Sequence, residues 1–315
     1  MWFWFSLIAL ICWSGSDLFS KIGCQDADDK YSHLKMVMAV GLVMGLHAAY
    51  EIFINGTEIN GSILLTYLPV SLLYISSMTI GYIGLRYIEL SISSPICNSS
   101  GALVAVLALV TGGLGDLVPA QLVATALVCV GVIGLGIVEA REDDDLRAAR
   151  QQASNHRYAK SALALILPVI YCLLDALGTF ADSRVLETLN EDSANCAYEL
   201  TFLLAGIVCF VYVVLIKKSR LVPKREGPKY AGAVCETAGQ FAYIYALADT
   251  EHVALAAPII SAYCVASVLW SRIFLKEKLS WKHYAMIALV VAGIVILGIY
   301  CLLYTSPSPR DRTRS

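Results

Sequence analysis

Ser94-Pro95-Ile96 returns in this chain as Ala257-Pro258-Ile259, and the likeness spreads outward from both copies. Aligned positions recur at nearly constant offsets of 158 to 163 residues, as in the pairs Asp17/Asp175, Tyr67/Tyr230 and Gly131/Gly293. Internal symmetry of this kind, when it covers most of a chain, is typical of membrane folds built from two structural repeats. The sequence therefore predicts two copies of one structural unit.

The composition is that of a membrane protein. Hydrophobic residues make up 58% of the 315 positions, charged residues make up 15%, and the mean hydropathy is +0.67. In a typical soluble domain about a quarter of the residues are charged. A helix needs about 20 apolar residues to cross ~30 Å of hydrocarbon. We therefore expect an all-α membrane protein with ten transmembrane helices, at residues 2–22, 33–53, 63–85, 90–112, 117–138, 160–181, 195–216, 229–248, 253–275 and 281–300.

The two repeats are predicted to be inverted relative to each other. Each contains five segments, and because five is odd, the second repeat enters the membrane from the opposite side. We expect five-helix repeats at residues 1–138 and 160–300, joined by a charged linker at residues 139–159. Residues 301–315 are predicted to be foreign to the fold. Their first six residues match the translation of a transposase end used in sequencing libraries, and the following residues continue into its adapter.

The basic residues give an independent test of this topology. Outside residues 301–315 the chain has twenty lysines and arginines, and nineteen of them lie in loops that follow odd-numbered segments. Only Arg184 lies in an even-numbered loop. Cytoplasmic loops of membrane proteins are enriched in lysine and arginine. We therefore expect a multi-pass protein of the cell (plasma) membrane, with odd-numbered loops in the cytoplasm and both termini outside.

With this repeat and these ten segments, the chain resembles the drug/metabolite transporter superfamily, and in particular its ten-span EamA-type members. The likeness is carried by Tyr245–Ile259, Phe274–Leu279 and the glycine-spaced helix around Gly293, with counterparts at Ser91–Ile96 and Gly131–Gly136. The resemblance implies secondary transport of a small metabolite or drug-like solute by alternating access. Transport by members of this superfamily is commonly export coupled to a proton or other ion gradient, so the resemblance also implies such export.

The clearest functional candidate is Glu236, an acid near the middle of the eighth segment. A charge at the bilayer centre costs about 2.5–3.5 kcal/mol on insertion scales, so an acid at this depth needs a role. Gln240 and Tyr243 follow at i+4 and i+7, on the same helical face. Glu236 is expected either to accept a proton or a cationic group, or to be a protonated acid that hydrogen-bonds a neighbouring helix. On the aligned face of the third segment, Ser77 and Tyr74 are further candidates.

Two aspartates occupy matching places in the first segment of each repeat. Inversion would place Asp17 and Asp175 towards opposite mouths of a central cavity, where they could attract or gate the solute. The alternative is a structural role, since Asp17 can also pair with Lys21 at i+4.

Matching prolines lie in the fourth and ninth segments. Pro95 and Pro258 have no amide hydrogen and cannot close the preceding helical turn, which would leave carbonyl groups free. Asn98 and Tyr263 follow them and are the neighbouring substrate candidates. The alternative is that each proline marks the first turn of a helix.

The sequence does not predict an enzyme. It contains no HExxH, GxSxG or P-loop motif. Its ten cysteines lie singly, without the spacing of metal ligands, so neither a metal nor a cofactor is expected. The expected partners are a small-molecule solute, the lipid bilayer and protons, without nucleic acid, and the protein is expected to be a monomer or a homodimer. The alternative to a carrier is a structural or sensory membrane protein that uses the same fold without solute flux.

Overall fold

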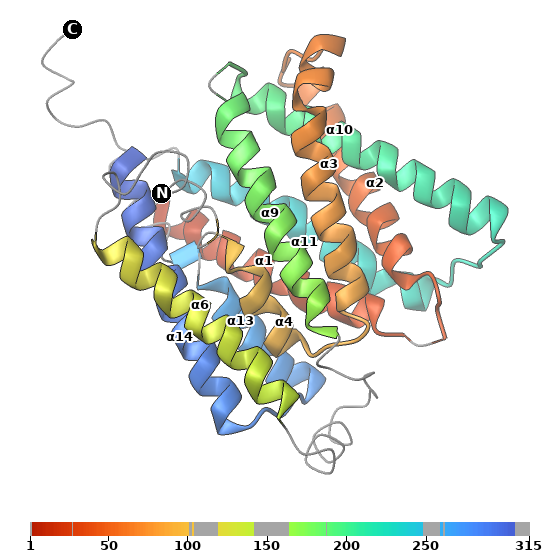
Figure 1. Ribbon diagram of the computed structural model, residues 1–315. Coiled ribbons are helices and arrows are strands. Elements are labelled where there is room, and N and C mark those ends of the chain that lie inside the picture. The colour runs from red at the N-terminus through yellow and green to blue at the C-terminus, as the bar shows by residue number, and fades with distance from the viewer. Residues whose placement is uncertain are drawn as a thin grey trace, which may run out of the picture.

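The computed structural model describes residues 2–26, 28–100, 103, 119–141, 164–186, 188–247, 259–260 and 262–305. This part of the chain is helical and contains no strand (Figure 1). A helix lies in each of the ten predicted segments. In chain order the elements are α1 (Trp2–Cys24), α2 (Ser32–Phe53), α3 (Gly61–Gly84), α4 (Leu90–Cys97), α6 (Pro119–Ala140), α9 (Ile166–Val185), α10 (Glu191–Phe210), η2 (Val211–Ile216), α11 (Pro223–Leu247), α13 (Tyr263–Trp270), η3 (Ser271–Leu275) and α14 (Trp281–Thr305).

Several of these helices have the length and composition of membrane spans. Four helical stretches are both long and apolar enough to cross a bilayer, namely α1, α2, α3 and the continuous stretch Glu191–Ile216. Shorter apolar helices lie at Leu122–Leu135, Tyr263–Leu275 and Trp281–Ile296. Large apolar side chains on the outer faces are exposed, as on α10, because their solvent in a membrane is lipid. The helices are therefore those of a multi-pass membrane protein.

Some helices begin earlier than hydropathy predicts, for identifiable local reasons. Helix α10 begins at Glu191 because the Asn190 side chain accepts hydrogen bonds from the amides of Asp192 and Ser193 and caps the helix. Helix α11 begins at Pro223, so its first two turns are polar. At the other end of the chain, α14 continues to Thr305, five residues into the segment expected to be foreign.

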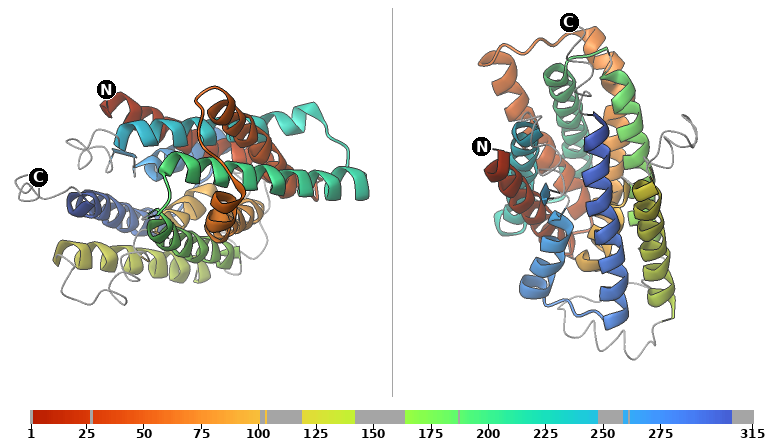
Figure 2. Two further views of the ribbon diagram at one scale, coloured as in Figure 1. Left: turned by 90° about the horizontal axis from the view of Figure 1, so that it is seen from above. Right: turned by 90° about the vertical axis from the view of Figure 1, so that its left-hand side faces the viewer.

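The helices pack in pairs that are far apart in the sequence. Helix α1 packs on α11, α2 on α10, α3 on α9, and α6 on α14, while the short helices α4 and α13 pack on each other. The pair α6 and α14 forms one flank of the bundle, with α4 and α13 next to it (Figures 1 and 2). Thus every long helix of the N-terminal part has its main neighbour in the C-terminal part.

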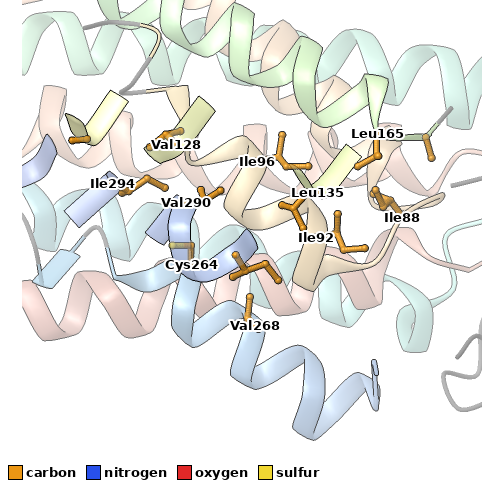
Figure 3. Packing of buried hydrophobic residues seen from close by; sticks show 13 residues of the cluster. Ile88, Ile92, Ile96, Val128, Leu135, Leu165, Cys264, Val268, Val290 and Ile294 are labelled. Atoms are coloured by element: carbon orange, nitrogen blue, oxygen red, sulfur yellow. The ribbon is translucent and has the colours of Figure 1, made fainter. Parts of the chain in front are cut away.

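The tight packing of these pairs depends on glycine and on small apolar side chains. In α2, a Cβ at Gly41 would lie 3.1 Å from the Cα of Gly206 in α10, so the two backbones almost touch. Such close approach is how small residues join helices in membranes, where no hydrophobic effect drives association. The largest apolar cluster joins α4, α6, α13 and α14, and Figure 3 shows Val128 of α6 close to Val290 and Ile294 of α14.

One end of the bundle is closed by a buried ion-pair network. The ammonium of Lys35 lies 3.1 Å from Asp29 and 3.3 Å from Glu226, and the ammonium of Lys229 lies 3.1 Å from Glu226 and 3.7 Å from Asp29. All four side chains are at most 9% exposed. The network joins the loop after α1 and the start of α2 to the first turns of α11.

At the same end, Glu277 caps a helix that lies far away in the sequence. Its carboxylate accepts hydrogen bonds from the amides of Leu90 and Ser91, both at 3.0 Å, and from the Ser91 hydroxyl at 2.7 Å. These amides belong to the first turn of α4. The amide donors in the first turn of any helix have no hydrogen-bond partner within that helix. Nearby, the ammonium of Lys21 donates to the carbonyls of Leu85 and Ile88, each at 2.6 Å.

Candidate functional site

A cavity of about 690 Å³ lies where the central helices meet. Its described lining comes from α1, α3, α4, α9, α10, α11, α13 and α14, with Leu85, Asn98, Ser100 and Ile260 in addition. Both parts of the chain therefore contribute to one cavity. The lining mixes carboxylates, hydroxyls, amides and aromatic rings, which is an unusual collection for the centre of an apolar bundle.

The structure brings eight of the nine predicted solute or proton candidates to this cavity: Asp17, Tyr74, Asn98, Asp175, Glu236, Gln240, Tyr243 and Tyr263. The ninth, Ser77, is fully buried, and its hydroxyl donates to the carbonyl of Tyr74 at 2.7 Å. Ser77 is not among the residues that line the cavity.

Of the two matching prolines, Pro95 lies among the described residues, inside a short helix. Pro95 is the sixth residue of α4, so it does not stand at the start of that helix. The helix ends two residues later, and the Asn98 amide side chain donates to the Ser94 carbonyl at 2.9 Å. Pro258 lies outside the described residues.

Asp17 of α1 connects the two short helices. Its Oδ2 accepts a hydrogen bond from the Ser94 hydroxyl of α4 at 2.6 Å and from the Ser267 hydroxyl of α13 at 2.7 Å. Lys21, the partner considered from the sequence, directs its ammonium to backbone carbonyls at the end of the bundle. Two neutral serine hydroxyls therefore hold the Asp17 carboxyl group, and neither of them carries a positive charge.

Asp175 and Glu236 have similar surroundings. The Asp175 carboxyl is hydrogen-bonded by the Ser100 hydroxyl, and the Glu236 carboxyl is hydrogen-bonded by the Ser16 hydroxyl. The charges of Asp17 and Asp175 both act on Glu236, so the three acids share one electrostatic environment. When they are ionised, carboxylates that act on one another inside a low-dielectric bundle repel. A bound cation or proton would relieve that repulsion.

A fourth acid, Asp182, was missed by sequence reasoning. Its carboxylate accepts hydrogen bonds from the hydroxyls of Tyr67, at 2.7 Å, and Tyr74, at 3.5 Å, and it lines the cavity. The predicted sixth segment ended at residue 181, which placed Asp182 in a loop. The helix in fact continues to Val185. The signal was the polar stripe of Asp175, Thr179 and Asp182 at i, i+4 and i+7.

Aromatic rings form much of the remaining wall. Trp13 packs against Tyr243, with ring centroids 5.2 Å apart, and against Tyr263 at 5.5 Å. On the other side of the site Tyr74 and Tyr198 meet edge to face at 5.9 Å. Four tyrosines of the lining were not predicted: Tyr67, Tyr82, Tyr171 and Tyr198. Tyrosine is also common at membrane surfaces, so its presence in a segment does not by itself indicate a cavity.

The cavity is acidic. Its described lining holds four carboxylates and no lysine, arginine or histidine. No group of three His, Cys, Asp or Glu side chains that could hold a metal ion occurs in the described part of the chain. The arrangement is suited to binding an extended polar or cationic molecule.

An apolar helical bundle with a polar cavity between its two parts is the architecture of a membrane transporter. Comparison with protein families agrees with this assignment. The model of the EamA-like transporter family matches residues 162–299. This match places residues 162–299 in the drug/metabolite transporter superfamily, whose members are transporters rather than enzymes. No curated protein matches the chain.

Proposed function

We propose that this protein is a secondary transporter that moves a small metabolite or drug-like solute across the membrane by alternating access. The observation that carries the proposal is the cavity, whose 690 Å³ lies in the size range of small-molecule sites and whose polar lining comes from both parts of the chain. We further propose export coupled to a proton or other ion gradient. Asp17, Asp175 and Glu236 would take up the coupling ion or the solute.

The proposed architecture is a pair of inverted five-helix repeats, at residues 1–138 and 160–300, joined by residues 139–159. The helix contacts support it, because exchanging the repeats maps the most extensive helix contacts onto one another. Helix α1 packs on α11 and α13, while its counterpart α9 packs on α3 and α4. Helix α2 contacts α11, while its counterpart α10 contacts α3. The pairs α2/α10, α4/α13 and α6/α14 each join a helix to its own counterpart.

Aligned residues support the same relation at the contact between α6 and α14. A Cβ at Gly131 would come within 2.5 Å of the Val290 side chain, and one at Gly293 within 2.5 Å of the Val128 side chain. Gly131 aligns with Gly293, and Val128 aligns with Val290, at the same offset. The contact is therefore reciprocal, as an approximate two-fold axis between the repeats requires.

For the orientation, we propose that the odd-numbered loops are cytoplasmic, that both termini are outside, and that the protein resides in the cell membrane. The proposal of one side for these loops is supported by the ion-pair network and the Glu277 cap, which bring loops of this set together at one end, while the choice of the cytoplasmic side rests on their lysines and arginines. The cavity lining extends towards the other end, where Asp182 lies close to the end of α9. A C-terminal reporter that is active only in the cytoplasm should be silent, and an active one would overturn the orientation.

Transport is tested with purified protein in proteoliposomes under an imposed pH gradient, with solutes drawn from a growth screen of overexpressing cells. A carrier moves solute without consuming it and loses flux when the gradient is abolished. Glu236→Gln is expected to lose the pH dependence of flux, whereas the matched exchange Glu58→Gln, at an exposed loop residue, should keep it. Solute binding without flux in any gradient would instead indicate the structural or sensory alternative.

A further inference from the structure

We propose that the cavity selects an organic cation, an ammonium compound with an apolar body and without a carboxylate or phosphate group. This inference rests on the proposed function, since it names the class of solute for the same cavity. It follows from three features of the lining: uncompensated carboxylates, absence of described cationic side chains, and aromatic rings next to the acids.

The carboxylates are held by groups that do not neutralise them. Asp17 accepts from two serine hydroxyls, Asp182 from two tyrosine hydroxyls, and Glu236 is hydrogen-bonded by one serine. A hydroxyl donor orients a carboxylate and leaves its negative charge in place. Because a buried charge is costly without a partner, the site is completed either by a proton or by a positively charged solute.

An anionic group would find no positively charged partner among the described lining residues. The described lining has no lysine, arginine or histidine, and the sequences at 101–118 and 248–258, which border the described cavity helices, contain no lysine or arginine. Lys21, which is close in sequence to Asp17, donates to backbone carbonyls at the end of the bundle. Solutes that carry a carboxylate or phosphate, including zwitterions, would therefore meet like charge.

The aromatic rings indicate an organic cation rather than a metal ion. The charges of Asp17, Asp175 and Glu236 act on Tyr263. The centroid of the Tyr263 ring lies 5.5 Å from that of the Trp13 ring. Aromatic faces attract ammonium groups, and carboxylates near them add to that attraction. No cluster of three metal-ligating side chains occurs among the described residues, and a bare proton would not need a cavity of 690 Å³.

Unsatisfied polar atoms indicate where the solute would sit. The indole nitrogen of Trp13, the Ser20 hydroxyl and the Tyr82 hydroxyl are buried, line the cavity and lack a hydrogen-bond partner among the described residues. Buried polar groups in proteins are almost always paired, so such atoms in a cavity wall mark positions for a ligand or for water. The two hydroxyl oxygens can accept a hydrogen bond from an ammonium group, whereas the Trp13 indole N–H can only donate and would need water as its partner. They line the same cavity as Asp17 and Glu236.

The test is a binding series with probes of nearly the same shape. Purified protein in lipid nanodiscs is titrated calorimetrically with 2-phenylethylammonium, with its anionic analogue 3-phenylpropanoate, and with its neutral analogue 3-phenylpropan-1-ol. Tetramethylammonium and 1,4-diaminobutane serve as smaller and divalent ammonium probes. We expect at least one ammonium compound to bind at least about tenfold more tightly than the anionic and neutral analogues.

Variants locate the binding. Asp17→Asn and Glu236→Gln should each weaken the ammonium probe by about tenfold or more, while Glu58→Gln should leave its affinity unchanged. The comparison of probes on the unaltered protein does not depend on whether these variants fold. Equal or tighter binding of the anionic or neutral analogue, or no binding of any ammonium probe, would overturn the inference.

Flux measurements separate this inference from the proposed function. If an ammonium probe binds selectively but does not cross proteoliposome membranes, the solute class stands and the carrier proposal fails. If neutral or anionic solutes are carried and the ammonium probes neither bind nor compete, the carrier proposal stands and the solute class fails.

Discussion

The Glu277 cap on helix α4 gives the sharpest prediction about stability. Glu277 is 1% exposed and lies in the loop before α14, yet it accepts three hydrogen bonds from Leu90 and Ser91. Glu277→Ala would leave two buried amide donors of the first helical turn without a partner. It would also remove a negative charge from a helix N-terminus, where the helix dipole favours one.

The expected loss can be estimated from these contacts. Hydrogen bonds to charged groups contribute about 1.5–3 kcal/mol each, and an unsatisfied buried donor costs about 1–3 kcal/mol. Since the three bonds share one carboxylate, their contributions are not additive, and we expect a total of about 3–5 kcal/mol. For a chain of this size about 1 kcal/mol corresponds to roughly 2–4 °C, which predicts a melting temperature lower by about 10 °C.

The assay can use the protein's own cysteines. Four of the described free cysteines, Cys24, Cys172, Cys196 and Cys264, are buried, so a thiol-reactive dye reports unfolding in detergent. Glu277→Gln keeps one acceptor oxygen and should melt between the wild type and the alanine variant.

The control for this experiment is Glu58→Ala, which removes an exposed glutamate side chain and should not shift the melting temperature. Ser91→Ala removes only the hydroxyl contact and should cost about 1 kcal/mol. A Glu277→Ala variant that melts within about 2 °C of the wild type, which corresponds to roughly 1 kcal/mol or less, would refute the capping argument.

Two further predictions concern the buried ion-pair network and the contact between α6 and α14. Lys229→Met leaves Asp29 and Glu226 with one ammonium group between them, and should destabilise the protein by about 3 kcal/mol, measured in the same thermal assay. Destabilisation that disappears at high salt would show that the network is exposed to solvent. Gly131→Ala would force the backbones of α6 and α14 apart and should cost about 1–3 kcal/mol. Gly227→Ala, which meets nothing within 4 Å, should be neutral or stabilising, and equal effects at the two positions would contradict the close contact.

Much of the fold was predictable because a membrane imposes simple requirements on a chain. A span needs about 20 apolar residues, so hydropathy located a helix in every predicted segment. The ends of the helices were predicted less accurately, because capping side chains and ion pairs determine where a helix begins. Asn190 starts α10 earlier by capping it, and the polar first turns of α11 are held by ion pairs that only the folded structure brings together.

The site was predictable where a residue was too polar for its surroundings. Asp17, Asp175 and Glu236 stand out in apolar segments, and all three line the cavity. The tyrosines did not stand out, because tyrosine suits lipid interfaces as well as cavities. Ser77 was selected by its alignment with Gln240, but alignment does not fix which part of a helical face meets the cavity.

The packing of α1 determines the order in which the protein can assemble. Helix α1 ends at Cys24, and α11, its main neighbour, begins only at Pro223. A first helix that inserts during synthesis enters the bilayer before α11 has been made. Until then the face of α1 that will contact α11 is exposed to lipid. Helices that insert singly and associate later can tolerate this delay. A chain released halfway would be inserted but unable to close its bundle.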